Sequence, residues 1–329
     1  MVIAIDESGS FAEGTETRHF FAAVHLRQRR TLYKLKQNQF LDWERSLSSA
    51  LKNGRGEIKS SVLSDDELVK FTHRVMCAHP YVGITPFSIR PADNPKAIVD
   101  KHRAVQLAGI REGAREYSVE GKPDMAKRYQ EFGNWFEKLS YVQYLKIVVL
   151  GECVTAAMVN AIGHSITGHY DEELTRMRFQ IDRDFIREPV HNWFWHEVLR
   201  NQLWNSSKQN PIPLLKRWKQ KGHPFLKKYS RSGQLDFNEL FWKQCEFVTS
   251  HEHFEILIAD AVSTIISRFF NQRRCAQAYR LIKKCFLADG KMQQLLLNDF
   301  DVNAYRYDPN DNPWKSSKRS DPKYENAVS

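Results

Sequence analysis

The stretch Val2-Ile3-Ala4-Ile5-Asp6-Glu7 sets four apolar residues in a row before two carboxylates. A continuous apolar run of this length is typical of a strand buried on both faces of a sheet. We therefore expect a strand over residues 2–5 that stops at Asp6, at a sheet edge. The apolar run from His19 to His25 predicts a second buried strand, close enough in sequence to pair with the first as a hairpin.

Two later segments extend the predicted sheet. Residues 81–89 form an apolar run that contains Pro86, and because proline cannot donate to a ladder we expect this third strand to lie at the sheet edge or to be interrupted. Residues 177–181 alternate apolar and polar side chains and end on Asp182, which predicts a half-buried strand. Two predicted strands thus end on a carboxylate.

The rest of the pattern is helical and predicts an α/β fold in one domain over residues 1–300. Helices are expected over 29–52, after a capping box at Ser64, and over 252–270 and 275–286. A helical insertion covers about 94–170, within which 144–150 fits either a helix or a strand, and a basic insertion covers about 206–233. Residues 301–329 form a polar tail that we expect to be flexible.

The composition favours a cytoplasmic protein with a polyanionic partner. The formal net charge of +10 points first to nucleic acid, because lysines and arginines on phosphates release condensed counterions. The five cysteines lack the spacing of a zinc site and are expected to be reduced thiols. The chain has neither a signal-peptide pattern nor an uninterrupted apolar run of about 18 residues, so no membrane partner is expected.

The positive charge gathers in the predicted basic insertion. No acid occurs between Glu197 and Asp236, and aromatic residues including Trp204, Phe225 and Tyr229 lie between the cations. Such aromatics stack on bases while the cations follow phosphates. The alternative is a solvated basic loop whose aromatics pack on the domain. The predicted nucleic-acid-binding residues are Lys59, Lys216, Arg217, Trp218, Lys219, Lys221, Lys227 and Lys228.

Four carboxylates are candidate metal ligands, since Mg²⁺ takes hard oxygen ligands, typically one or two carboxylates with water and substrate phosphate. Asp6 and Asp182 would lie side by side if their strands are neighbours in one sheet. Asp260 interrupts an apolar helix, where a lone carboxylate is costly unless it is paired, neutralised or metal-bound. Ordinary roles stay open: a strand end or cap for Asp6 and Asp182, a salt bridge for Asp260, and a solvated loop position for Glu57.

Glu7 differs from its neighbour Asp6. Adjacent residues on an extended backbone face opposite sides, so we expect Glu7 to point away from Asp6 unless the strand has already turned there. Ser8 and Gly9 would allow the following loop to approach a phosphate closely.

Four motifs carry a resemblance to a known family. They are Ile5-Asp6-Glu7-Ser8-Gly9-Ser10, Glu57-Ile58-Lys59, Phe179-Gln180-Ile181-Asp182 and Leu257-Ile258-Ala259-Asp260-Ala261-Val262. In these motifs and their order, the sequence resembles the family labelled domain of unknown function 3800, a ribonuclease H-like group. The resemblance spans about residues 1 to 270 and is specific at the first and last motifs.

The resemblance implies a ribonuclease H-like mixed sheet flanked by helices, with a carboxylate cluster that holds Mg²⁺ or Mn²⁺. The metal ligands would be Asp6, Glu7, Glu57, Asp182 and Asp260, of which Asp6 would bridge two ions. The expected function is a metal-dependent nuclease that hydrolyses phosphodiester bonds of DNA or RNA, in phage defence or a mobile element. The alternatives are a catalytically inactive nucleic-acid-binding or adaptor protein and a small-molecule phosphohydrolase. A homodimer through the apolar helix over 254–266 also stays open.

Overall fold

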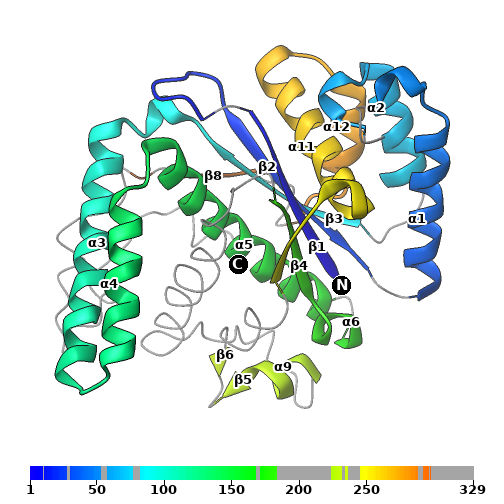
Figure 1. The fold of residues 1–329 in the computed structure, drawn as a ribbon. Coiled ribbons are helices and arrows are strands. Elements are labelled where there is room, and N and C mark those ends of the chain that lie inside the picture. Colours follow the sequence, from blue (N-terminus) through cyan, green and yellow to red (C-terminus); the bar gives the residue numbers. More distant parts are fainter. Residues whose placement is uncertain are drawn as a thin grey trace.

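A mixed six-stranded sheet carries helices on both faces (Figure 1). The computed structural model describes residues 1–9, 11–27, 30–52, 58–76, 82–167, 171–183, 224–231, 234–235, 245–287, 292–295 and 297. The order of strands in the sheet is β7-β4-β1-β2-β3-β8. Their bounds are β1 (Val2–Ser8), β2 (His19–Leu26), β3 (Val82–Ile89), β4 (Arg178–Asp182), β7 (Cys245–Val248) and β8 (Gln293–Leu295). The α/β class with a mixed sheet is therefore as expected.

One strand of this sheet runs against the others. β1 and β2 form the predicted antiparallel hairpin, in which Asp6 lies opposite Ala22 and Ser8 opposite Phe20. β2 is also antiparallel to β3, whereas β1 pairs with β4, β4 with β7 and β3 with β8 in parallel. β2 is thus reversed relative to the other five strands.

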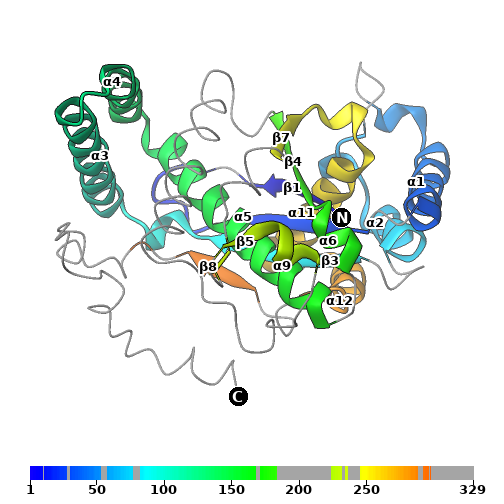
Figure 2. The same cartoon turned by 90° about the horizontal axis from the view of Figure 1, so that it is seen from below.

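Each face of the sheet has its own helical layer, as Figures 1 and 2 show. α11 (Phe254–Gln272) packs on β1 and β2, and α12, α2 and α1 lie on its side. α5 (Tyr141–Thr167) packs on β2 and β3 from the other side. There α3 and α6 contact α5, and α4 packs on α3. The remaining helix bounds are α1 (Arg30–Arg45), α2 (Asp65–Phe71), α3 (Lys96–Val119), α4 (Pro123–Glu137), α6 (Asp171–Thr175), α9 (Pro224–Tyr229) and α12 (Ala276–Lys283).

The alternation of side chains along β1 divides the core in two. Val2 and Ala4 belong to the core under α11, whereas Ile3 and Ile5 belong to the core under α5. Because successive strand residues point to opposite faces, Asp6 continues the α11 face and Glu7 the α5 face.

Several element boundaries differ from the sequence-based expectations. β1 continues to Ser8, so Asp6 lies within the strand and not after it. α1 ends at Arg45, before residue 52, whereas residues 144–150 lie inside α5. The capping box at Ser64 is present, with the side chain of Glu67 reciprocating. β7 and β8 were not predicted, because each is a short strand with little apolar alternation.

Of the two alternatives for Pro86, the edge position is wrong, and the structure has an interruption of the pairing on one side of the strand. β3 lies between β2 and β8, with Pro86 opposite Ala22. On the β8 side, Ile84 exchanges hydrogen bonds with the segment around Cys285, and the regular pairing with β8 starts only at Phe87. Pro86 falls between these two contacts, so its missing donor costs no ladder bond.

α5 is the one helix in the described part of the chain that is long and apolar enough to span a membrane. By length and composition it passes that test over Tyr141–Ser165, although polar residues interrupt its sequence. Much of the same helix is buried under the sheet, through residues such as Leu145, Val149 and Met158. Burial of this kind is what a core helix shows, and the absence of a membrane partner stays a prediction.

The apolar surface of α11 is also covered within the chain. Residues from Glu255 to Ala259 and from Ala261 to Arg268 are all buried. The apolar composition of 254–266 therefore reflects the core and gives no argument for a homodimer. The four cysteines described, Cys153, Cys245, Cys275 and Cys285, are free thiols, and Cys77 lies outside the described residues.

Candidate functional site

Neighbouring parallel strands bring two aspartates together. Ile5 of β1 pairs with Ile181 of β4, so the next residues, Asp6 and Asp182, lie side by side. Their side chains are on the α11 face of the sheet. Both are buried, with 8% and 5% of their surface exposed. The expectation that these two carboxylates are neighbours is confirmed.

A third carboxylate, Asp260, approaches this pair from α11. It is half-buried, not enclosed on all sides as its apolar surroundings in the sequence had suggested. The backbone N–H of Ser60 donates to its Oδ2 at 2.9 Å. Asp260 therefore anchors the chain at Ser60, directly after Ile58 and Lys59.

Burial and the neighbouring acids affect the pKa of Asp6. Burial raises the pKa of Asp6 well above its ordinary value, and the negative charges of Asp260 and Asp182 raise it further. The backbone N–H of Glu7, which donates to Asp6 Oδ1 at 2.7 Å, acts in the opposite direction. No described cation forms an ion pair with Asp6. The carboxylate is thus stabilised either by a proton or by a cation that the described side chains do not supply.

Glu7 lies on the opposite face of the sheet. Lys146 of α5 donates to its Oε1 at 2.6 Å, and β1 has not turned at this position. Burial raises the pKa of Glu7 to about 7, which Lys146 partly offsets. The expectation that Glu7 points away from Asp6 is confirmed, and its inclusion among the metal ligands is not supported.

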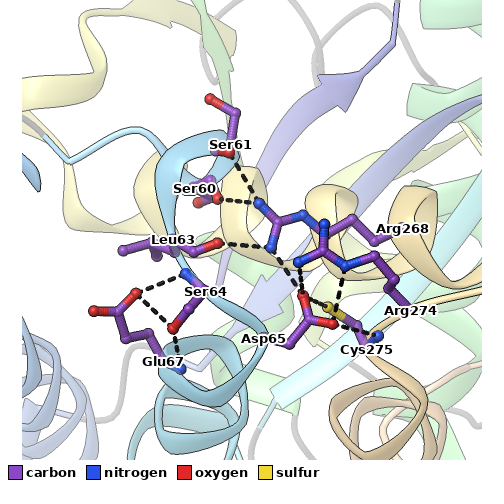
Figure 3. Close-up of polar contacts among 9 residues, drawn as sticks. All are labelled: Ser60, Ser61, Leu63, Ser64, Asp65, Glu67, Arg268, Arg274 and Cys275. Carbon is purple, nitrogen blue, oxygen red and sulfur yellow. Dashed lines mark hydrogen bonds and ion pairs between the residues drawn. The ribbon is translucent and has the colours of Figure 1, made fainter. Parts of the chain in front are cut away.

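A buried arginine holds the segment beside Asp260 in place (Figure 3). Arg268, two turns further along α11, donates to the carbonyl oxygens of Leu63 at 2.7 Å and Ser61 at 2.9 Å. It also contacts Asp65 at 3.2 Å, and Arg274 contacts the same carboxylate from the surface at 2.9 Å. The turn over Ser60–Val62 is thereby fixed against α11.

The other predicted site residues divide into two groups. Glu57 and five residues of the basic insertion lie outside the described residues: Lys216, Arg217, Trp218, Lys219 and Lys221. Lys59 is half-buried at the start of the turn that Asp260 anchors. Lys227 and Lys228 are exposed on α9, where Lys228 donates to the carbonyl oxygen of Thr175 at 3.0 Å.

Two aromatics of the basic insertion do not face solvent. Phe225 and Tyr229 on α9 are 0% and 2% exposed. They pack in the core under α5, so they are unable to stack on bases. For these two residues the alternative reading, aromatics packed on the domain, is correct.

A polar network beside the carboxylates was not anticipated. Gln180, two residues before Asp182 on the same face of β4, is fully buried. Its Nε2 donates to Glu246 Oε1 at 3.0 Å and lies 3.2 Å from Nδ1 of His253, the residue before α11. A glutamine inside the strand run 178–181 was the signal that could have revealed it.

No known protein family, curated protein or solved structure matches this chain. The resemblance to the family labelled domain of unknown function 3800 therefore rests on the four sequence motifs alone.

The carboxylates fit a hard divalent cation by their chemistry. Asp6 and Asp182 offer adjacent carboxylate oxygens, and Mg²⁺ typically takes one or two carboxylates and completes its shell with water and substrate phosphate. Within the described ranges, no group of three or more His, Cys, Asp or Glu side chains is close enough to hold a metal ion. The described residues thus fit a site built on two carboxylates, with Asp260 as a nearby third charge.

Proposed function

We propose that the protein is a divalent-metal-dependent nuclease that hydrolyses phosphodiester bonds of DNA or RNA. The observation that carries the proposal is Asp6: a buried carboxylate whose charge is disfavoured by burial, Asp260 and Asp182. A hard cation such as Mg²⁺ or Mn²⁺ would remove this cost. Without one, a charged carboxylate buried as Asp6 is, next to two further acids, is an expensive arrangement.

The topology supports a ribonuclease H-like assignment as part of this proposal. Five strands follow the order β3-β2-β1-β4-β7, and β2 alone is reversed. This is the arrangement expected of a ribonuclease H-like core, whose central strand carries the first acid. Asp6 is on that central strand, and Asp182 is on the parallel neighbour.

The roles of the residues follow from their positions. Asp6 and Asp182 would bind the cation, and Asp260 would contribute charge from α11 while anchoring Ser60. A bound divalent cation would activate water and stabilise the developing negative charge on the phosphate and leaving oxygen. Lys59, next to the anchored residue, would contact a substrate phosphate. Glu57 stays a predicted ligand of the same site.

A second candidate is a catalytically inactive nucleic-acid-binding or adaptor protein with the same core. The observation in its favour is that the described carboxylates do not form a complete metal-holding group of three. Such a protein would bind nucleic acid in EDTA and would not cleave it with any metal.

The decisive experiment is cleavage of labelled single- and double-stranded DNA and RNA with Mg²⁺, Mn²⁺ or EDTA. Wild type is compared with Asp6→Asn and Asp182→Asn, which remove charge and keep shape. The matched control is Asp124→Asn, because Asp124 is an exposed aspartate on α4, away from the sheet.

We expect metal-dependent cleavage by wild type and Asp124→Asn, and none by the two site variants. Circular dichroism and thermal unfolding establish that the variants remain folded. Full activity in Asp6→Asn, or activity that EDTA leaves unchanged, contradicts the metal-nuclease proposal. Binding without cleavage in every metal selects the adaptor function.

A further inference from the structure

Phe270, near the end of α11, is an exposed aromatic side chain on the helix that also carries Asp260. It is 41% exposed and is the only aromatic among the large hydrophobic side chains that the structure describes as exposed. Its ring packs on Phe20 and Tyr279, each with a centroid separation of 5.4 Å. These neighbours hold the ring in one orientation and leave part of its surface open to solvent.

The position of Phe270 follows from the hairpin register. Phe20 lies opposite Ser8, two residues past Asp6, on the face of the sheet that α11 covers. Phe20 is therefore a diagonal neighbour of Asp6, and such neighbours lie about 7–8 Å apart. Along α11, Phe270 is ten residues past Asp260, or about 15 Å.

The helix that packs beside Phe270 is strongly basic on its outer side. Arg280, Lys283 and the C-cap residue Lys284 are exposed, and their i, i+3, i+4 spacing places them on one side of α12. None of the three forms an ion pair within the part of the chain that the structure describes. Residues 261–288 contain six lysines and arginines and no acid; of these six, Arg268 and Arg274 pair with Asp65.

We propose that Phe270 and the cations of α12 form a binding surface for single-stranded nucleic acid that leads toward Asp6. A base would stack on the open part of Phe270, and Arg280, Lys283 and Lys284 would follow the phosphates. The inference deepens the proposed nuclease function. It rests on that function for the claim that the bound nucleic acid leads toward Asp6. It does not depend on the predicted basic insertion, which lies mostly outside the described residues.

The chemistry of this surface favours a nucleic acid over an anionic membrane. A helix that binds a membrane surface presents several large apolar side chains beside its cations. None of the exposed large hydrophobic residues that the structure describes belongs to α12. A single flat ring beside a row of cations instead matches a chain of bases and phosphates.

The test measures binding apart from turnover, with the Asp6→Asn protein in EDTA and a fluorescent single-stranded oligonucleotide. Affinity is read by anisotropy over a range of salt concentrations. The α12 variant replaces Arg280, Lys283 and Lys284 by glutamine. The matched control replaces Lys101, Lys127 and Lys138, which are exposed on the α3–α4 hairpin and just after it, and it loses the same charge.

We expect the α12 variant to bind at least about tenfold more weakly and to lower the salt slope by about 2, because each lost phosphate contact removes about 0.7. Phe270→Ala should weaken binding by about 5- to 100-fold, whereas Phe270→Trp should retain it. The control should keep the wild-type slope.

Two results would overturn this inference. The first is an equal loss of slope in the α12 variant and the control, which would reduce the effect to net charge. The second is binding of the α12 surface to phosphatidylserine vesicles without any effect on the oligonucleotide. Cleavage is measured separately with Asp6 intact, which distinguishes a wrong surface from a wrong reaction. Cleavage by that protein, together with an unchanged salt slope in the α12 variant, would reject the surface alone.

Discussion

Replacing Arg268 by leucine tests whether one buried side chain holds the segment beside Asp260. The guanidinium donates to the carbonyl oxygens of Leu63 and Ser61 and contacts Asp65, with only 10% of its side chain exposed. A buried hydrogen bond to a charged group contributes about 1.5–3 kcal/mol, and an orphaned buried carbonyl adds a penalty. We expect Arg268→Leu to lower the free energy of unfolding by about 3–5 kcal/mol.

Arg274 provides the matched control for this variant. It pairs with the same carboxylate, Asp65, but 53% of its side chain is exposed. A pair of this kind contributes about 0.2–1 kcal/mol, so Arg274→Leu should change stability little. Figure 3 shows the two arginines on the shared acid.

The measurement combines thermal unfolding with hydrogen exchange. For a chain of this size, we expect the unfolding temperature of Arg268→Leu to fall by about 5–10 °C and that of Arg274→Leu by about 2 °C or less. Exchange over residues 58–65 should accelerate in Arg268→Leu, because the bond from the Ser60 N–H to Asp260 loses its support. Equal effects of the two variants, or unchanged exchange at Ser60, would refute the reasoning.

Three further predictions concern a glycine turn, a buried histidine and Asp6. Gly9→Ala should be strongly destabilising, since Gly9 has φ +126° and an added Cβ would lie 2.2 Å from Nδ1 of His19. The control Gly14→Ala, at φ +68°, meets no atom within 4 Å and should cost about 1 kcal/mol. Similar unfolding midpoints of the two variants in urea would contradict this prediction. His25 has its pKa lowered by burial to about 3, so the unfolded chain binds more protons below pH 6.5 and stability falls as pH decreases, by roughly 3 kcal/mol between pH 7 and pH 4. Urea titrations should show a weaker pH dependence in His25→Gln, and an unchanged slope would reject this cause. Asp6→Asn should be more stable than wild type in EDTA at pH 7, because the pKa of Asp6 is raised by burial and neighbouring acids. Mg²⁺ should raise the melting temperature of wild type only. An equal response of both proteins to Mg²⁺ would count against metal binding at Asp6.

Much of the sheet could be predicted from the sequence because its central strands are apolar on both faces. The run from Val2 to Ile5 and the run from His19 to His25 predicted the hairpin, and the hairpin with its parallel neighbour β4 sets the side-by-side position of Asp6 and Asp182. The alternation of residues on a strand was enough to separate Glu7 from Asp6. These are local rules, and tertiary packing left them intact.

The features that were missed depend on contacts between distant segments. β7 and β8 are short and owe their strand form to pairing with β4 and β3, which a local pattern does not reveal. Asp260 was expected inside a fully buried helix, but its carboxylate lies at the margin of the α11 contact and is bonded to Ser60, 200 residues away in the chain. The burial of Phe225 and Tyr229 likewise follows from packing under α5 and not from their basic surroundings.

The spacing of residues along α11 matches the positions of three other segments of the chain. It meets Ser60 through Asp260, the following turn through Arg268, and the backbone of Arg18 through Asn271, whose Nδ2 donates at 2.7 Å. Each added residue turns a helix by about 100° and lengthens it by about 1.5 Å. A single alanine inserted between Asp260 and Arg268 would leave every side chain in the sequence, yet Arg268 and Asn271 would both face the wrong way. The spacing of residues along α11 is therefore as strict a requirement of this protein as their identity.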